Sequence, residues 1–248
     1  MIEVRQLGKS FGTHRVLDGV NLRIEPGEPV TIIGRSGGGK SILLKHLVGL
    51  LSPDEGDVLV DGKSIARMNE RELLRVRSKF GMLFQSAALF DSLTVAENVS
   101  FVLRRERKLT PGEIAKRVAE ALEMVELNGT QNKKPSELSG GMRKRVGLAR
   151  AIIHRPEIVL YDEPTTGLDP VVSDSIDLLI IRVSEALKVT SVVVTHDMRS
   201  ARRVGRRILM LHQGKIYTTG TPEEMFNSRD PIVRNFVEGI SNPKEHNF

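Results

Sequence analysis

Short apolar runs rich in β-branched residues recur along the chain, and several are followed by a segment with helical spacing of its apolar positions. The clearest runs span 29–34, 157–164 and 190–197, and each has the length of a strand that is buried on both faces. Helical segments follow at 41–50 and 171–187. This alternation of strand and helix predicts an α/β fold with a parallel sheet.

Two other parts of the chain have different patterns. Strand-like segments separated by turn signals such as Pro26-Gly27 dominate the N-terminal part. Charged, helix-forming stretches dominate about 92–153, including 111–127, where Pro111 suits a helix start. We therefore expect an N-terminal antiparallel β subdomain and a helical insert. The remaining expected strands are 2–7, 16–24, 56–62, 80–84, 206–211 and 214–220, the last two joined at Gln213-Gly214.

Composition narrows the class of protein only slightly. The 248 residues are 40% hydrophobic and 27% charged, which is ordinary for a soluble globular protein, and the absence of cysteine excludes disulfides and thiolate metal sites. The net charge is +6, but acids are interleaved with most of the basic residues, so we interpret it as a solvated basic surface and expect no nucleic-acid partner. We also expect no signal peptide and no membrane span, because no run approaches roughly 20 apolar residues.

Residues 34–41, at the end of the apolar run 29–34, have the pattern G-x-x-x-x-G-K-[ST] of a phosphate-binding loop. Glycines let the backbone turn so that successive N–H groups face phosphate oxygens, and the next helix adds its positive end. Lys40 supplies a charge for the β- and γ-phosphates, and the Ser41 hydroxyl is a ligand for Mg²⁺. The motif alone indicates an NTPase or a kinase. The residues expected to contact ATP here are Gly34, Arg35, Ser36, Gly37, Gly38, Gly39, Lys40, Ser41 and Ile42.

Two acids end the apolar strand at 158–163. Because the carboxyl ends of strands line the ligand crevice of an α/β sheet, Asp162 is predicted to lie near Mg²⁺. Glu163 is predicted to accept a proton from the attacking water or to orient it. The alternative is that the two acids only cap a strand at the surface. The phosphate loop in the same chain favours the functional interpretation.

A second candidate anion site lies in the helical insert. Ser139 suits a helix N-cap, and the amides of Gly140 and Gly141 stand at the positive end of a helix of good formers. A helix cap without a ligand is the alternative for these three residues taken alone.

Leu138–Met142, with the sequence LSGGM, resembles the signature of the ABC ATPases, which is usually written LSGGQ. The resemblance covers about residues 1–225. It implies a P-loop NTPase with a RecA-like parallel-sheet core and a helical subdomain at about 86–153. It also implies two chains paired head to tail, with each ATP held between the phosphate loop of one and the signature of the other. The family's other motifs are the phosphate loop at 34–41, the Gln loop at Gln85, the acidic strand at 158–163, the D-loop at 167–169 and the switch histidine His196.

The resemblance implies roles for four further residues. Gln85 would contact Mg²⁺ or the attacking water, and His196 would contact the γ-phosphate. Asp169 would lie at the dimer interface. Phe11 stands where the family often has an aromatic residue stacked on adenine, and a core phenylalanine is the alternative.

Two residues depart from the family pattern. Met142 replaces the common Gln of the signature, which removes an amide contact at the helix start but leaves Ser139 and the glycine amides. Ile42 stands where Thr is frequent, and we expect its side chain to pack under the helix. Phosphate binding should survive both changes.

A single ATPase domain with no fused membrane span, no coiled-coil insertion and no second ATPase domain favours a transporter subunit. Three segments, at 82–90, 138–145 and 230–240, resemble the ATPases of the MCE-associated (Mla) phospholipid transport systems. That resemblance implies a homodimer at the cytoplasmic face of the inner membrane. Its partners would be membrane permease subunits, an MCE lipid-binding protein and a small STAS-domain protein. The alternatives are another ABC importer, for an amino acid or other small solute, and a DNA-associated ABC ATPase.

The end of the chain forms a separate unit in this interpretation. The ABC ATPase domain spans 1–228, and a tail helix occupies 229–248. The tail places Ile232, Phe236 and Val237, together with Ile240, at helical spacing on one face. The sequence leaves open whether this face packs on its own domain or on the partner subunit.

Overall fold

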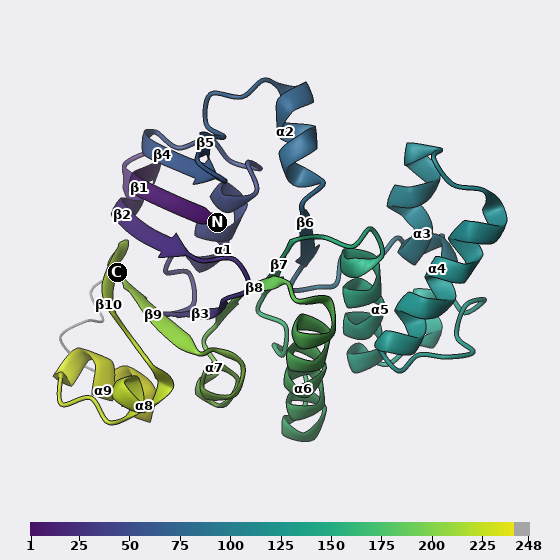
Figure 1. Ribbon diagram of the computed structural model, residues 1–248. Coiled ribbons are helices and arrows are strands. Elements are labelled where there is room, and N and C mark those ends of the chain that lie inside the picture. Colours follow the sequence, from purple (N-terminus) through teal and green to yellow (C-terminus); the bar gives the residue numbers. More distant parts are fainter. Residues whose placement is uncertain (241–248) are drawn as a thin grey trace.

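The computed structural model describes residues 1–240, which form two β-sheets with helices around them (Figure 1). Every pairing in the smaller sheet is antiparallel, as predicted for the N-terminal subdomain. Its first two strands are longer than the apolar pattern indicates, because they continue as a hairpin that pairs Phe11 with His14. The order is β2-β1-β4-β5, with β1 at Ile2–Phe11, β2 at His14–Ile24, β4 at Glu55–Val60 and β5 at Lys63–Ser64.

The larger sheet carries the predicted parallel core. Its order is β10-β9-β3-β8-β7-β6, and its pairs are parallel except for the β9–β10 hairpin, which turns at Gln213 and Gly214 as predicted. The carboxyl ends of β3, β6, β7 and β8 therefore meet at one edge. The strands are β3 (Pro29–Ile33), β6 (Phe80–Leu83), β7 (Ile158–Asp162), β8 (Thr190–Thr195), β9 (Arg207–His212) and β10 (Lys215–Gly220).

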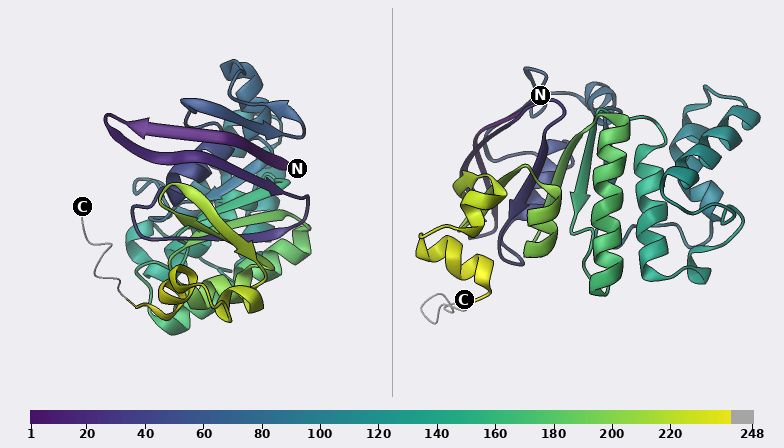
Figure 2. Two further views of the ribbon diagram at one scale, coloured as in Figure 1. Left: turned by 90° about the vertical axis from the view of Figure 1, so that its left-hand side faces the viewer. Right: turned by 60° about the horizontal axis from the view of Figure 1, so that its bottom comes forward.

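Helices surround the larger sheet unevenly. In Figures 1 and 2, α5 and α6 stand side by side next to the sheet, α3 and α4 lie beyond α5, and α8 and α9 lie at the opposite end. In residues 1–240, no helix is both long and apolar enough to cross a membrane. The α-helices are α1 (Lys40–Leu47), α2 (Glu70–Arg77), α3 (Val95–Glu106), α4 (Pro111–Met124), α5 (Gly140–Ile152), α6 (Pro170–Leu187), α7 (Met198–Val204), α8 (Pro222–Phe226) and α9 (Pro231–Glu238).

Strand β7 lies between two hydrophobic clusters. Val159 and Tyr161 pack into a cluster with the helices α3 to α6, whereas Ile158 and Leu160 pack into a second cluster with α1 and the antiparallel sheet. Successive side chains of a strand point to opposite faces, so one buried strand serves both clusters. The strand that ends in the two acids is thereby fixed from both sides.

Two helices show where the sequence patterns were less informative. Helix α2 was not predicted, because it buries none of its residues and its clearest signal is the capping box between Asn69 and Glu72. Helix α9 lies in the predicted tail, and Ile232, Phe236 and Val237 pack against their own domain. The domain boundary at 228 stays a prediction, and residues 241–248 of the predicted tail lie outside the described residues.

Candidate active site

The phosphate loop joins β3 to α1, as predicted. Gly37 and Gly39 have φ angles of 76° and 94°, in the left-handed region that favours glycine. A Cβ atom added at Gly39 would also lie 3.0 Å from a methyl carbon of Val16. The loop therefore keeps a tight turn that ends where α1 begins at Lys40, with the positive end of the helix facing the turn.

Lys40 is buried, with 4% of its surface exposed, and connects the loop to β7. Its ammonium donates hydrogen bonds to the carbonyl oxygens of Gly34 at 2.8 Å and Arg35 at 3.0 Å. It also lies 3.2 Å from Oε1 of Glu163. The two charged groups that the sequence analysis placed at the phosphate and at the attacking water are thus in contact.

Ser41 and Asp162 meet at the same edge of the sheet. The Ser41 hydroxyl donates to Oδ1 of Asp162 at 2.6 Å, joining the first turn of α1 to the end of β7. A hydroxyl and a carboxylate are hard oxygen donors of the kind that Mg²⁺ takes beside substrate phosphates and water. This donor pair therefore fits the predicted metal.

Glu163 follows β7 with a φ of 47°, an uncommon value for a residue other than glycine. Its carboxylate Oε2 lies 2.8 Å from Nδ1 of His196 and accepts from the Thr166 hydroxyl at 3.2 Å. Its backbone N–H donates to the carbonyl of Val194 in the neighbouring strand. The acid is buried, whereas almost half of the His196 side chain is exposed, so the pair connects the interior to the surface.

Most of these groups line a cavity of about 270 Å³ at the predicted edge of the sheet, whereas Gly34, Gly38 and Asp162 do not line it. Gln85 lines it, as expected from its position after β6. Arg35 instead lines a small cavity beside α9, together with Phe236 and Ile240. The cavity is lined by Ser36, Gly37, Gly39, Lys40, Ser41, Ile42, Gln85, Glu163, Thr166 and His196.

Comparison with known proteins identifies the family of this chain. The family described as ABC transporter matches residues 17–166. The chain belongs to the ABC transporter family. Its members are ATP-hydrolysing transport ATPases, and this chain is accordingly an ATP-binding and ATP-hydrolysing protein. The predicted P-loop NTPase fold is confirmed by the solved structures of similar ABC cassettes.

Three similar proteins give the family relationship more detail. The probable ribonucleotide transport ATP-binding protein mkl of Mycobacterium leprae is 43% identical, over 96% of this chain and 69% of that protein. The intermembrane phospholipid transport system ATP-binding protein MlaF of Haemophilus influenzae is 41% identical, over 97% of this chain and 91% of that protein. A bacterial ABC transporter cassette solved as a dimer matches with a TM-score of 0.83 and 37% identity, over 90% of this chain and 99% of that chain.

The ABC signature lies at the start of α5, away from the cavity. Ser139 caps the helix by accepting from the Met142 N–H at 3.3 Å, and its side chain is exposed. Cβ atoms added at Gly140 and Gly141 would lie 3.2 Å from Leu168 and 2.6 Å from Val172. The signature therefore packs beside the D-loop of its own chain, and none of residues 139–141 lines the 270 Å³ cavity.

Two other predicted residues have local roles in this ABC domain. Asp169 caps α6, because its Oδ1 accepts from the N–H groups of Val171 and Val172 at 3.0 Å each. Phe11 is 47% exposed, and the Lys9 ammonium lies 5.7 Å from its ring centre. The core alternative for Phe11 is therefore wrong, while its contact with adenine stays a prediction.

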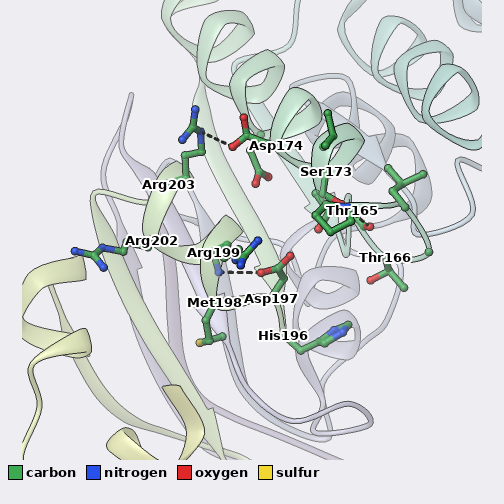
Figure 3. A pocket seen from close by; sticks show the side chains of 15 residues that line it. Thr165, Thr166, Ser173, Asp174, His196, Asp197, Met198, Arg199, Arg202 and Arg203 are labelled. Atoms are coloured by element: carbon green, nitrogen blue, oxygen red, sulfur yellow. Dashed lines mark hydrogen bonds and ion pairs between the residues drawn. The ribbon is translucent and has the colours of Figure 1, made fainter. Parts of the chain in front are cut away.

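A larger cavity of about 1080 Å³ adjoins the site and shares Thr166 and His196 with it (Figure 3). Asp177 lines this cavity and is 3% exposed, and its Oδ2 accepts from the Ser200 hydroxyl at 2.7 Å. Its Oδ1 has no hydrogen-bond partner within the described residues. Burial, with a smaller contribution from Asp197, raises the pKa of Asp177 to about 6. Asp177 thus connects α6, which follows the D-loop, to α7, which follows His196.

Two side chains of the site were not predicted from the sequence. Thr166 bonds to Glu163, and its place just after the acidic strand was the available signal. Lys144 is buried on α5 and donates to the carbonyl oxygens of Gln85 and Glu163. A lysine within the basic segment at 142–145 has no sequence signal that separates it from a solvated charge.

Proposed function

We propose that this chain is the ATPase subunit of a transporter that moves phospholipid across the bacterial envelope, and that it works as a homodimer around two MgATP. The convergence of Lys40, Ser41, Asp162, Glu163 and His196 at one sheet edge carries the ATPase part of this proposal. The phospholipid part rests on likeness to the Haemophilus protein over 91% of that protein's length.

Binding begins with the phosphate loop. Its turn and the start of α1 present backbone N–H groups to the β- and γ-phosphates, and Lys40 adds a positive charge. Ser41 and Asp162 would hold Mg²⁺, which neutralises phosphate charge and orients the γ-phosphate when bound. Phosphate oxygens are charged and therefore bind the Lys40 ammonium more strongly than the two neutral loop carbonyls that it contacts. Glu163 is then available to the attacking water.

Glu163 orients this water and accepts its proton. His196 contacts Oε2 of the acid at 2.8 Å, and the Thr166 hydroxyl donates to the same oxygen at 3.2 Å. Gln85 lines the same cavity and would contact the water or the metal. Because the carboxylate is fixed by several bonds, little reorganisation is needed when the reaction occurs.

Dimerisation completes the site. The exposed Ser139 and the signature amides form an anion-binding helix end outside the cavity of their own chain. In a head-to-tail pair, this end contacts the γ-phosphate held by the other chain. Asp169 lies between the subunits, and Phe11 stacks on adenine. The related cassette that was solved as a dimer supports such a pair.

Membrane subunits dock near the Gln loop in this proposal. Phe90 and Phe101 are 45% and 39% exposed and stack with ring centres 4.8 Å apart, beside a groove of about 420 Å³ that Arg104, Arg105 and Arg107 help to line. An exposed aromatic pair of this kind suits a protein partner. A membrane permease is the partner we assign to it, with the chain peripheral on the cytoplasmic face of the inner membrane. An MCE lipid-binding protein and a STAS-domain protein complete the assembly by resemblance.

The decisive test of the ATPase is Glu163→Gln. We expect MgATP binding to remain and hydrolysis to fall by at least about 100-fold, since a general base contributes on that order. Turnover of the variant at the original rate would contradict the role given to Glu163. ATP binding is measured by titration calorimetry and hydrolysis by phosphate release, with wild type in parallel.

The substrate is tested separately. The tagged chain is purified from detergent-solubilised membranes, and its accompanying proteins and lipids are identified by mass spectrometry. Co-purification with a polytopic membrane protein and bound phospholipid supports the proposal. A permease that binds ribonucleotide, as the name of the mycobacterial relative indicates, or an amino acid would favour another importer. Salt-sensitive DNA binding would favour the DNA-associated alternative.

A further inference from the structure

Lys144 is a buried cation on the helix that carries the ABC signature. It is 5% exposed, and its ammonium donates to the carbonyl oxygens of Gln85 and Glu163, the latter at 3.1 Å. Burial lowers the pKa of Lys144, while Asp162 and Glu163 favour its charged form. One side chain of α5 thus contacts the two segments that carry the predicted metal and water ligands.

The two carbonyls belong to neighbouring strand ends. Strands β6 and β7 pair in parallel up to Leu83 and Tyr161, and Gln85 and Glu163 each follow two residues later. Carbonyl groups beyond the last rung of a sheet need another donor when they are buried. A single ammonium with three N–H groups donates to both and links them, and the Glu163 carbonyl also accepts from the Thr166 N–H at 3.3 Å.

The same helix holds the rest of the Gln loop. Arg150 donates to the carbonyl oxygens of Ala87 at 2.7 Å and Ala88 at 2.6 Å. Both alanines have positive φ angles, of 61° and 46°, which are strained for residues with a side chain. Lys144 and Arg150 together keep this backbone conformation attached to α5.

Helix α5 also lies unusually close to β6. A Cβ atom added at Gly147 would lie 2.8 Å from a methyl carbon of Leu83, and one added at Gly81 would overlap the carbonyl oxygen of Ala151. Glycine on both elements lets their backbones touch. The helix therefore has little freedom to slide on the strand, and a fixed helix gives Lys144 a fixed position.

We propose that Lys144 is a positioning residue for hydrolysis: from the signature helix, it holds Gln85 and Glu163 at the separation that the attacking water requires. It touches neither substrate nor metal and acts through these two residues. The inference rests on the roles given to them in the proposed function.

The test compares Lys144→Met with Lys144→Gln in the full chain. Methionine and glutamine reach about equally far, each one bond short of lysine, but only glutamine keeps a neutral N–H donor. We expect kcat of Lys144→Met to fall about 10- to 100-fold, the effect of a misplacement near 1 Å, with the Kd for ATP changed less than about threefold. Lys144→Gln should recover part of the lost turnover.

Controls separate positioning from folding. Lys116→Met removes an exposed lysine of α4 and should match wild type. Thermal unfolding of each variant gives the fraction folded at the assay temperature. Equal turnover per folded molecule in Lys144→Met and wild type would overturn the inference, as would a loss confined to ATP affinity or one that glutamine does not relieve.

The same assay contains Glu163→Gln. A wild-type chain without ATPase activity, or a fully active Glu163→Gln, contradicts the proposed function itself. An active wild type and an inactive Glu163→Gln beside a fully active Lys144→Met overturn only the role of Lys144.

Discussion

The two anion-binding regions of this chain are built in different ways. At the phosphate loop, side chains from α1 and from just after β7 and β8 line one cavity. Lys40 and His196 each contact the carboxylate of Glu163. Ser41 donates to Asp162 at the end of β7. At the signature, Ser139 is exposed at the start of α5, and Gly140 and Gly141 form the first turn of that helix. The first region is a nearly complete site, whereas the second offers one end of a helix.

The neighbours of the signature explain the difference. Gly140 and Gly141 lie against Leu168 and Val172 at the start of α6, so their close packing joins the signature to the D-loop. A helix end joined to a surface loop can meet a ligand that another molecule carries. The contrast thus favours a site shared between two chains. Changing one region at a time tests this arrangement.

The largest effect is expected at the first region. Lys40→Met removes the cation that contacts the loop carbonyls and Glu163, and ATP hydrolysis should fall by roughly 1000-fold, at the upper end of what one electrostatic group contributes. Loss of MgATP binding by the single chain, measured by calorimetry, should accompany it. Retained binding and turnover would mean that the cavity is not the nucleotide site.

A smaller loss is expected at the second region. Ser139→Asp keeps an oxygen that caps α5 but places a negative charge where a phosphate would bind, and hydrolysis should fall about 100-fold. Binding of ATP to the single chain should not change. Ser139→Asn keeps the cap without the charge and should stay within a few-fold of wild type, so an equal loss in both variants would point to folding instead.

Mixing these two variants sharpens the comparison. A heterodimer of Lys40→Met and Ser139→Asp chains contains one site with both defects and one with neither if the chains pair head to tail. Activity should therefore return on mixing two inactive preparations, measured by phosphate release against each variant alone. Failure to recover activity, with heterodimers demonstrated by two tags, would contradict sites that are shared between chains.

The smallest effect is expected at Asp177, which connects the helix after the D-loop to the helix after His196. Asp177 has a pKa of about 6 when folded against an ordinary value of 3.8, so between these values the folded chain holds a proton that the unfolded chain has lost. Stability therefore falls as pH rises through this window, by at most about 3 kcal/mol. Asp177→Asn removes that penalty. Its melting temperature should exceed that of wild type by several degrees at pH 7.5, with a smaller gain at pH 5; a gain that does not vary with pH would contradict this account.

Local patterns were enough to predict the strand edges and the phosphate loop. Each is a run of adjacent residues whose geometry follows from its own chemistry, so Lys40 and Asp162 could be placed at one edge before the fold was known, whereas the role of His196 was implied by the family resemblance. The pairing of Glu163 with His196 was not predicted, although each had a role, because contact between residues 33 positions apart depends on the register of β7 and β8.

Lys144 and α2 could not be predicted for opposite physical reasons. Lysine is almost always exposed, so burial at Lys144 depends on two carbonyls supplied by distant strands. Helix α2 buries no residue, so it leaves no apolar stripe for a periodicity to reveal. Tertiary contacts determine the burial of Lys144, and local capping determines where α2 forms.

The shared strand β7 has a consequence for the lifetime of the active geometry. Its residues 158–162 are all buried, and its alternate side chains belong to two clusters. Amide protons in such a strand exchange with solvent only when the whole domain opens, whereas segments held by a few side-chain donors open separately. We therefore expect Asp162, and Glu163 directly after it, to lie in a slowly exchanging part of the chain. The two acids should keep their places while surface segments open and close, and the geometry of the site should last as long as the strand stays folded.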